Sequence, residues 1–228
     1  MLRSYRTMAL MPAFLLRDVT SFSPQLSFGV STYHRSINSS AQLRLRLSPE
    51  EIAGSLGPDR IIASEPFSWN ELKEIVKHGD PTMHSRSMEV QKRYILHSRQ
   101  VKNEWKSMND YILHSKFGFE KKMYRDGKFV SSPSLEQAKL QGRIETRLLL
   151  NDYSYYVCPG IEHWCLWKLG GNVESCELEW AKKELVGTDG GNVDEIMSWV
   201  NPPHLQSIPD IVHAHLLCLR SDENDKTT

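Results

Sequence analysis

NDYSYYVCPGIEHWCLW, residues 151–167, is the densest run of aromatic, amide, carboxylate and imidazole side chains in the sequence. It has a partner of similar character in NPPHLQSIPDIVHAHLLCL, residues 201–219. Residues 161–167 and 211–219 are short, apolar and rich in aromatic or β-branched side chains, which predicts two buried strands. We therefore expect the fold to be organised around these two strands.

The strand period decides which side chains of the two runs share a face. Residues two apart in a strand point the same way, so His163 lies with Cys165 and Trp167, and His213 lies with His215. If the two strands are neighbours, which the sequence leaves open, His163, His213 and His215 form one cluster.

Three interpretations of this cluster stay open. Three imidazoles suit zinc or another divalent metal with an open coordination position. Alternatively, one imidazole acts as an acid or base and another as a nucleophile on phosphorus, without a metal. In the third interpretation the histidines are core residues that bond to backbone or carboxylate groups.

Asn151 and Asp152 precede the first strand and form a turn or cap in the simplest interpretation, because their side-chain oxygens bond nearby N–H groups. The same pair is suited to orienting a sugar hydroxyl or supporting a histidine. The candidate catalytic residues are therefore His163, His213, His215, Asp152 and Asn151, and the three histidines are also the candidate metal ligands.

The composition of the 228-residue chain, 39% hydrophobic and 25% charged, is typical of a globular protein with a sizeable core. No apolar run reaches the roughly 18 residues that span a bilayer, so stable membrane insertion is not expected. Four cysteines without CxxC spacing indicate neither a zinc knuckle nor a dense disulfide framework.

Residues 1–48 differ from the rest of the chain, with six arginines, nine serines, no lysine and one acidic residue, Asp18. This composition predicts an organellar transit segment addressed to the mitochondrion, with a plastid or the cytoplasm as alternatives. A signal peptide and a disordered leader also stay open. The remainder holds 22 basic and 27 acidic residues, which argues against nucleic-acid binding.

Residues 49–220 are expected to form a single α+β domain, followed by a disordered tail at 221–228. Apolar residues recur at helical spacing from Val90 to Ile112, which predicts one amphipathic helix over about 87–116, packed on a small mixed or antiparallel sheet. Ser68 and Glu71 predict a capping box, Asp126-Gly127 a hairpin, and Ser175 a helix ending at Gly187. Asn192 and Glu195 predict a short helix to Trp199, and residues 134–150 stay undecided.

Five blocks resemble the N-acetylglucosamine-induced protein 1 family, a domain of unknown function, over roughly residues 67–219. They are FSWNELKEIV (67–76), Arg86-Ser87, NEWKSMNDYIL (103–113), NDYSYY with GIEHWCLW (151–156 and 160–167) and NPPHLQSIPDIVHAH (201–215). Ser154 departs from the family, which usually has proline there. The resemblance implies that the recurring positions are site candidates: Asn151, Asp152, His163, Trp167, Asn201, His213 and His215.

The family is named for a response to N-acetylglucosamine and not for a reaction. Two functions therefore remain. In the first, the protein binds or acts on an amino-sugar or phosphorylated metabolite through the histidine cluster. In the second, it is a non-catalytic regulatory or scaffold domain with structural histidines. The sequence settles neither the substrate nor the oligomeric state.

Overall fold

The structure, a computed structural model, describes residues 47–54, 62–78, 85–187, 192–203, 206 and 208–221. The predicted leader up to residue 46 and the tail beyond residue 221 lie outside this part of the chain. The elements, in chain order, are α2 (Pro49–Gly54), α3 (Trp69–His78), α4 (Met88–Glu104), α5 (Met108–Phe117), β1 (Glu120–Met123), β2 (Phe129–Ser132), α6 (Leu135–Leu140), β3 (Glu145–Leu150), β4 (Ile161–Leu169), α7 (Ser175–Val186), β5 (Val193–Val200) and β6 (Val212–Arg220). The predicted α+β class is confirmed.

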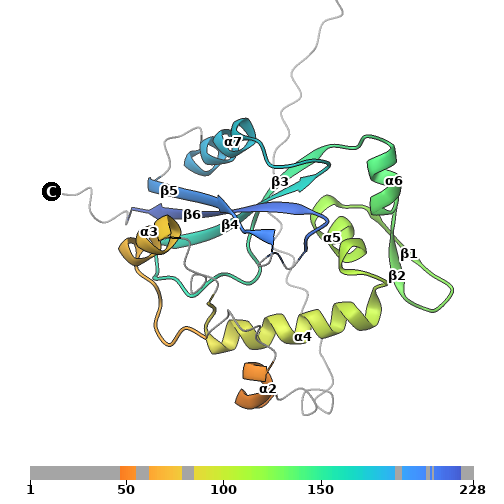
Figure 1. Cartoon of the computed structure of the whole chain (residues 1–228), viewed down its shortest axis with the longest axis horizontal. Helices are drawn as coiled ribbons and strands as arrows, with labels where there is room; N and C mark the ends of the chain where they lie inside the picture. The colour runs from red at the N-terminus through yellow and green to blue at the C-terminus, as the bar shows by residue number, and fades with distance from the viewer. Residues whose placement is uncertain are drawn as a thin grey trace, which may run out of the picture.

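A four-stranded antiparallel sheet in the order β3-β4-β6-β5 forms the centre of the fold (Figure 1). Its two middle strands are the strands predicted at 161–167 and 211–219. They pair directly, with Cys165 opposite His215 and Trp167 opposite His213. This neighbourhood, which the sequence left open, brings the three candidate histidines onto one face of the sheet.

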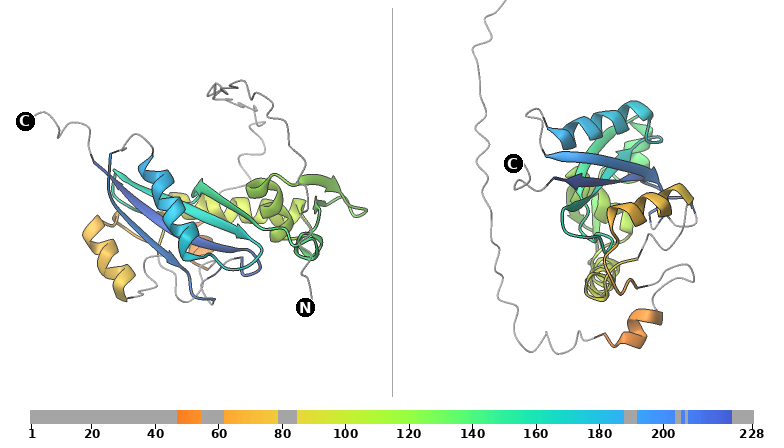
Figure 2. Two further views of the ribbon diagram at one scale, coloured as in Figure 1. Left: turned by 90° about the horizontal axis from the view of Figure 1, so that it is seen from above. Right: turned by 90° about the vertical axis from the view of Figure 1, so that its left-hand side faces the viewer.

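The two faces of the sheet are covered by different helices. On one face, Leu166, Ala214 and Leu216 pack against Ala181 and Leu185 of α7. The views along two axes agree that α7 lies on the side of the sheet away from α4 (Figures 1 and 2).

The opposite face carries two apolar clusters. One joins Trp69 and Leu72 of α3 to Leu217 of β6. The other joins α5 to the far end of β4, where Trp167 and Leu169 lie. Along both central strands the histidines fall between the residues of these two clusters, so the polar groups occupy a gap between two apolar contacts.

The single long helix predicted over 87–116 is wrong, because the chain forms two helices, α4 and α5, separated at residues 105–107. Trp105 has extended dihedral angles, and the N–H of Lys106 donates to the Phe129 carbonyl of β2 at 2.9 Å. The Ser107 side chain then accepts from the Asp110 N–H at 3.0 Å and starts α5. Apolar residues keep their helical spacing across this break, because the spacing reflects which side chains are buried and not the backbone angles.

The short helix predicted after Asn192 is also wrong, since residues 193–200 form the edge strand β5. This strand pairs with β6 from Val193 to Val200, with an irregularity between Val193 and Glu195. Glu195 does not cap a helix, because it accepts from the Trp69 indole at 3.1 Å and pairs with Lys73 of α3. Pairing in the sheet overrides the local helix signal.

The predicted cap at Ser175 is wrong by one residue, because Glu174 caps α7 and Ser175 is its first residue. Other local predictions are confirmed. Ser68 and Glu71 bond reciprocally at the start of α3, β1 and β2 form an antiparallel hairpin around Asp126-Gly127, and α7 ends before Gly187. The undecided segment contains α6 and β3. None of the described helices combines the length and apolar character that crossing a membrane requires.

Gly170 and Gly171, which follow β4, give a matched stability test. Both have positive φ, 76° and 91°. A Cβ on Gly170 would lie 2.5 Å from the Arg143 carbonyl oxygen, whereas within the described part of the chain nothing lies within 4 Å of one on Gly171. We expect Gly170→Ala to reduce the free energy of unfolding by about 2 kcal/mol and Gly171→Ala by about 1 kcal/mol, measured by urea unfolding. Equal effects would contradict the close approach to Arg143.

Candidate functional site

A cavity of about 120 Å³ lies between the histidine face of the sheet, helices α4 and α5, and the loop that precedes β4. Four of the five sequence candidates line it, namely Asn151, Asp152, His213 and His215. His163, the fifth, lies behind His215 and is almost completely buried, with 2% of its surface exposed. The structure thus brings all five into one neighbourhood, with four at the cavity wall.

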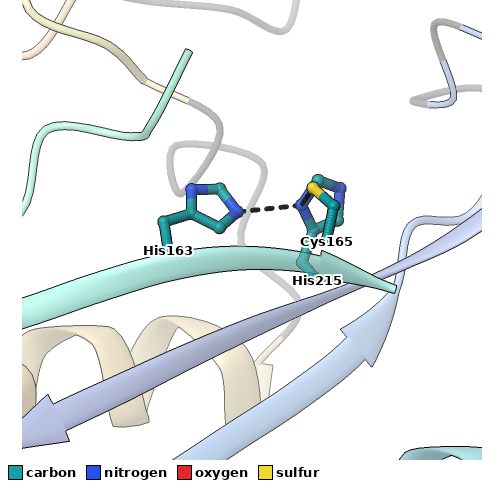
Figure 3. Close-up of side chains that lie close together, drawn as sticks. All are labelled: His163, Cys165 and His215. Atoms are coloured by element: carbon teal, nitrogen blue, oxygen red, sulfur yellow. Dashed lines mark hydrogen bonds between the residues drawn. The ribbon is translucent and has the colours of Figure 1, made fainter. Parts of the chain in front are cut away.

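His163 and His215 form a direct hydrogen bond across the β4–β6 pair. The distance from His163 Nε2 to His215 Nδ1 is 2.9 Å, and Figure 3 shows the two rings meeting edge to edge. Cys165, directly opposite His215 in the register, places its Sγ 3.8 Å from the same Nδ1. All three side chains are buried.

Two fixed donors act on the His163–His215 pair from opposite ends. The Tyr155 N–H can only donate, and it donates to His163 Nδ1 at 3.2 Å, which favours a proton on His163 Nε2. The Asn201 amide nitrogen, 3.0 Å from His215 Nε2, also donates, which favours a proton on His215 Nδ1. Two neutral rings cannot satisfy both donors, so the direction of the bond depends on which tautomers the rings adopt.

Asn201, at the end of β5, holds the far side of His215. Its Oδ1 accepts from the Trp199 indole N–H at 2.9 Å, and its amide nitrogen lies 3.0 Å from His215 Nε2. Tyr155 and Trp199 also pack their rings against His215, at centroid distances of 5.6 and 5.4 Å. His215 is thus held on its edges by polar groups and on its faces by aromatic rings.

His213 occupies a different environment from the other two histidines. Its ring stacks on Trp167 at 4.6 Å, and its Nδ1 lies 3.5 Å from the Ile211 carbonyl oxygen. Burial lowers the pKa of His213, so the ring is neutral near pH 7. It lines the cavity as an uncharged, stacked group.

A metal ion suits this arrangement poorly as it stands. Among the described residues the group that could hold one is His163, Cys165 and His215, whose ligating atoms lie within 4.8 Å of one another. Coordination by His163 Nε2 would require that nitrogen to be free of a proton while the Tyr155 N–H donates to Nδ1. Burial also raises the pKa of Cys165 to about 12, so a metal would have to displace the thiol proton to use this sulfur as a ligand. The three-histidine set stays a prediction, and His213 is outside this group.

Asn151 and Asp152 act first as a turn and an ion pair. Asn151 Oδ1 accepts from the Tyr153 N–H at 2.9 Å, which turns its amide nitrogen toward the His163 ring. Asp152 pairs with Lys116 of α5 at 2.5 Å. Lys116 is largely buried and Asp152 is half exposed, so the pair lies at the boundary between cavity and solvent.

The α4 side of the cavity is aromatic and basic. Arg86 donates to the Tyr153 carbonyl at 2.9 Å and stacks over Tyr94 at 4.6 Å. His97 of α4 stacks on Tyr153 at 5.5 Å. Burial raises the pKa of Tyr153 to about 12, so its phenol stays neutral. This wall offers rings and hydrogen-bonding groups without an unpaired negative charge.

The sequence predicted residues that line the cavity but gave no role to several other groups beside them. Cys165 was on the predicted face, two residues from His163, and that spacing could have identified it. Lys116 and the main chain of Tyr155 gave no local signal, because both reach the site only through the tertiary fold.

The comparisons with known proteins agree with the sequence resemblance. A family model described as "Protein of unknown function (DUF3605)" matches residues 68–219. The chain is 24% identical over 189 residues to N-acetylglucosamine-induced protein 1 of Candida albicans, covering 74% of each. It is 27% identical over 173 residues to an uncharacterized protein of Saccharomyces cerevisiae, covering 68% of this chain and 79% of the relative.

Among solved structures, the crystal structure of HTC1 matches with a TM-score of 0.45 and 23% identity, covering 71% of this chain and 89% of that one. The predicted resemblance to the N-acetylglucosamine-induced protein 1 family is confirmed by the matched residues and relatives. The chain belongs to the family described as Protein of unknown function (DUF3605).

Proposed function

We propose that the cavity binds a small polar metabolite of the amino-sugar class, free or phosphorylated, and that His215 is its proton-exchanging group. The observation that carries the proposal is the convergence of three imidazoles, two amide side chains and several aromatic rings on one cavity. A few polar groups set in an aromatic wall are typical of small-molecule sites.

The size of the cavity agrees with a monosaccharide. The cavity of about 120 Å³ has room for several water-sized groups, the scale of a small polar molecule. A disaccharide or a nucleotide would require the walls to move.

The wall chemistry matches a sugar with an amide substituent. Asn151 and Asn201 present amide groups that bond hydroxyl or acetamido oxygens, and His213 and His215 both donate and accept. The rings of Tyr155 and Trp167 supply flat apolar surface for the C–H face of a sugar.

The charged groups at the cavity extend the class to phosphorylated sugars. Arg86 and Lys116 both line the wall, and each already has a protein partner. A phosphate can therefore bind beside these cations, and in the free protein neither cation is left without a partner. The Candida relative is named for induction by N-acetylglucosamine, which supports the same class of ligand.

The His163–His215 pair gives the site an acid–base group that needs no metal. The hydrogen bond between His163 Nε2 and His215 Nδ1 holds the His215 ring in place and engages one of its two nitrogens. The other nitrogen, Nε2, faces Asn201 at the cavity. His215 is thus the group suited to exchange a proton with a bound ligand.

A ligand panel tests the proposal on the full chain. Calorimetry and thermal melting would compare N-acetylglucosamine, glucosamine and their 6-phosphates with glucose. We expect at least one amino sugar to bind and to raise the melting temperature, since ligand at 100 times Kd stabilises by about 2.7 kcal/mol. His213→Phe should raise Kd at least about tenfold, or 1.4 kcal/mol.

Glu179→Gln on the exposed side of α7 is the matched control and should bind as the wild type does. No binding by folded wild-type protein to any amino sugar in the panel would reject the proposal. That result would favour the regulatory or scaffold function with structural histidines.

A further inference from the structure

The β1–β2 hairpin is a feature that the cavity does not use. It projects from the body beyond α5 and α6, as the first two figures show (Figures 1 and 2). Every residue of β1 is exposed. The turn closes through the Tyr124 N–H to the Lys128 carbonyl at 2.7 Å, with Gly127 at a φ of 80°.

The tip of this hairpin exposes two large apolar side chains. Met123 is 70% and Tyr124 50% exposed. They follow one another where β1 enters the turn, and because successive side chains of a strand alternate faces, they flank the tip on its two sides. The Lys106 ammonium lies 4.8 Å from the Tyr124 ring centroid, and at least half of each side chain is exposed to water.

Cations surround these two side chains. Residues 120–128 contain Lys121, Lys122, Arg125 and Lys128 against two acidic residues. Asp126 is neutralised by Lys106 at 2.7 Å, and Glu120 lies 3.4 Å from Lys122. The hairpin is therefore positive, whereas residues 49–228 as a whole carry more acidic than basic residues.

We propose that the hairpin tip docks on an anionic lipid surface, with Met123 and Tyr124 entering the interface and the flanking cations facing the headgroups. An amphipathic aromatic ring and a flexible apolar chain suit the boundary between headgroups and acyl chains. Lysine and arginine near an anionic leaflet add an attraction that salt screens. The interaction is peripheral and independent of the cavity.

The shape of the tip favours lipid over an acidic protein. A narrow convex turn buries little area against a rigid partner, whereas a fluid interface closes around it. Outside the hairpin, residues 49–228 hold more acidic than basic residues and are repelled by the same surface, which orients the hairpin toward the lipid.

Sedimentation of the full chain with vesicles tests the proposal. The probes are phosphatidylcholine alone and phosphatidylcholine with about one third phosphatidylserine. We expect severalfold more binding to the anionic vesicles, lost at about 0.5 M salt. Lys122→Glu with Arg125→Glu should reduce binding at least about tenfold, because two attractions become repulsions. Met123→Ser with Tyr124→Ser should reduce it severalfold at unchanged charge.

The matched control is Lys182→Glu with Lys183→Glu on α7, which changes the net charge equally at another surface. Binding should stay within about twofold of the wild type. Equal binding to both vesicle types, or an equal loss in the α7 control, would overturn the proposal. Binding to soluble polyglutamate but not to vesicles would assign the hairpin to an acidic protein instead.

Discussion

Glu177→Ala is expected to reduce the free energy of unfolding by about 3–4 kcal/mol. Glu177 of α7 forms an ion pair with Lys168 of β4, whose side chain is only 7% exposed. It also accepts from the Thr146 hydroxyl at 2.5 Å and from the Glu174 N–H at 3.0 Å. Without the carboxylate, Lys168 keeps a positive charge under α7 with no opposite charge beside it.

Two variants separate the effect of the Glu177 charge from the effects of its shape and hydrogen bonds. Glu177→Gln keeps the shape and a hydrogen-bonding oxygen, so about 2–3 kcal/mol of loss should remain if the charge dominates. Glu177→Leu combined with Lys168→Met removes both charges and should recover most of the stability. Glu179→Ala, which breaks the exposed pair with Lys182 on the same helix, should change stability by about 0–0.5 kcal/mol. Guanidinium unfolding measures all four, and a Glu177→Gln variant as stable as the wild type would contradict the role of the charge.

The pH dependence provides a second readout of this pair. Burial raises the pKa of Glu177, but hydrogen bonds from Lys168 and Thr146 outweigh burial and hold it below its usual value. A carboxylate with a lowered folded-state pKa stabilises the protein above its unfolded pKa, about 4.3, and loses that contribution as pH falls through the folded value. The difference in stability between wild type and Glu177→Gln should therefore shrink on acidification below about pH 4.

The central strands of the sheet could be predicted because runs this short and this apolar fit neither a helix nor a loop. Residues 161–167 and 211–219 are too short for buried helices and too apolar for loops, so both became strands. The strand period then placed His163 with Cys165 and His213 with His215 correctly. Which strands are neighbours is a property of the whole sheet, and no local pattern carries it.

The failures have a common physical cause. Residues 105–107 and 192–195 are positions where the backbone bonds to a distant strand, β2 in one case and β6 in the other. A helix period and a cap signal record only local preferences, which tertiary hydrogen bonds override. The same limitation applies to the site. The chemistry of His163 depends on the Tyr155 main chain and that of His215 on the Asn201 side chain.

His163 and His213 look alike in the sequence, but their replacement by phenylalanine is expected to affect stability to very different extents. His163→Phe should lower the free energy of unfolding by about 3–5 kcal/mol, because it removes the acceptor of the buried Tyr155 N–H and the hydrogen-bond partner of His215 Nδ1. His213→Phe should change it by about 1 kcal/mol or less. Its ring is neutral and stacked on Trp167, and phenylalanine preserves that packing.

Urea unfolding with and without a chelator measures this contrast and separates hydrogen bonding from metal binding. If the losses on replacement of His163 come from the hydrogen bonds, they are the same in both conditions. A loss that appears only without the chelator would instead restore His163 as a metal ligand. We expect His213→Phe to stay folded and to lose ligand affinity. Comparison of the His163 and His213 variants therefore also distinguishes a binding cavity from a scaffold. If the domain is only a scaffold, there is no ligand binding for His213→Phe to weaken.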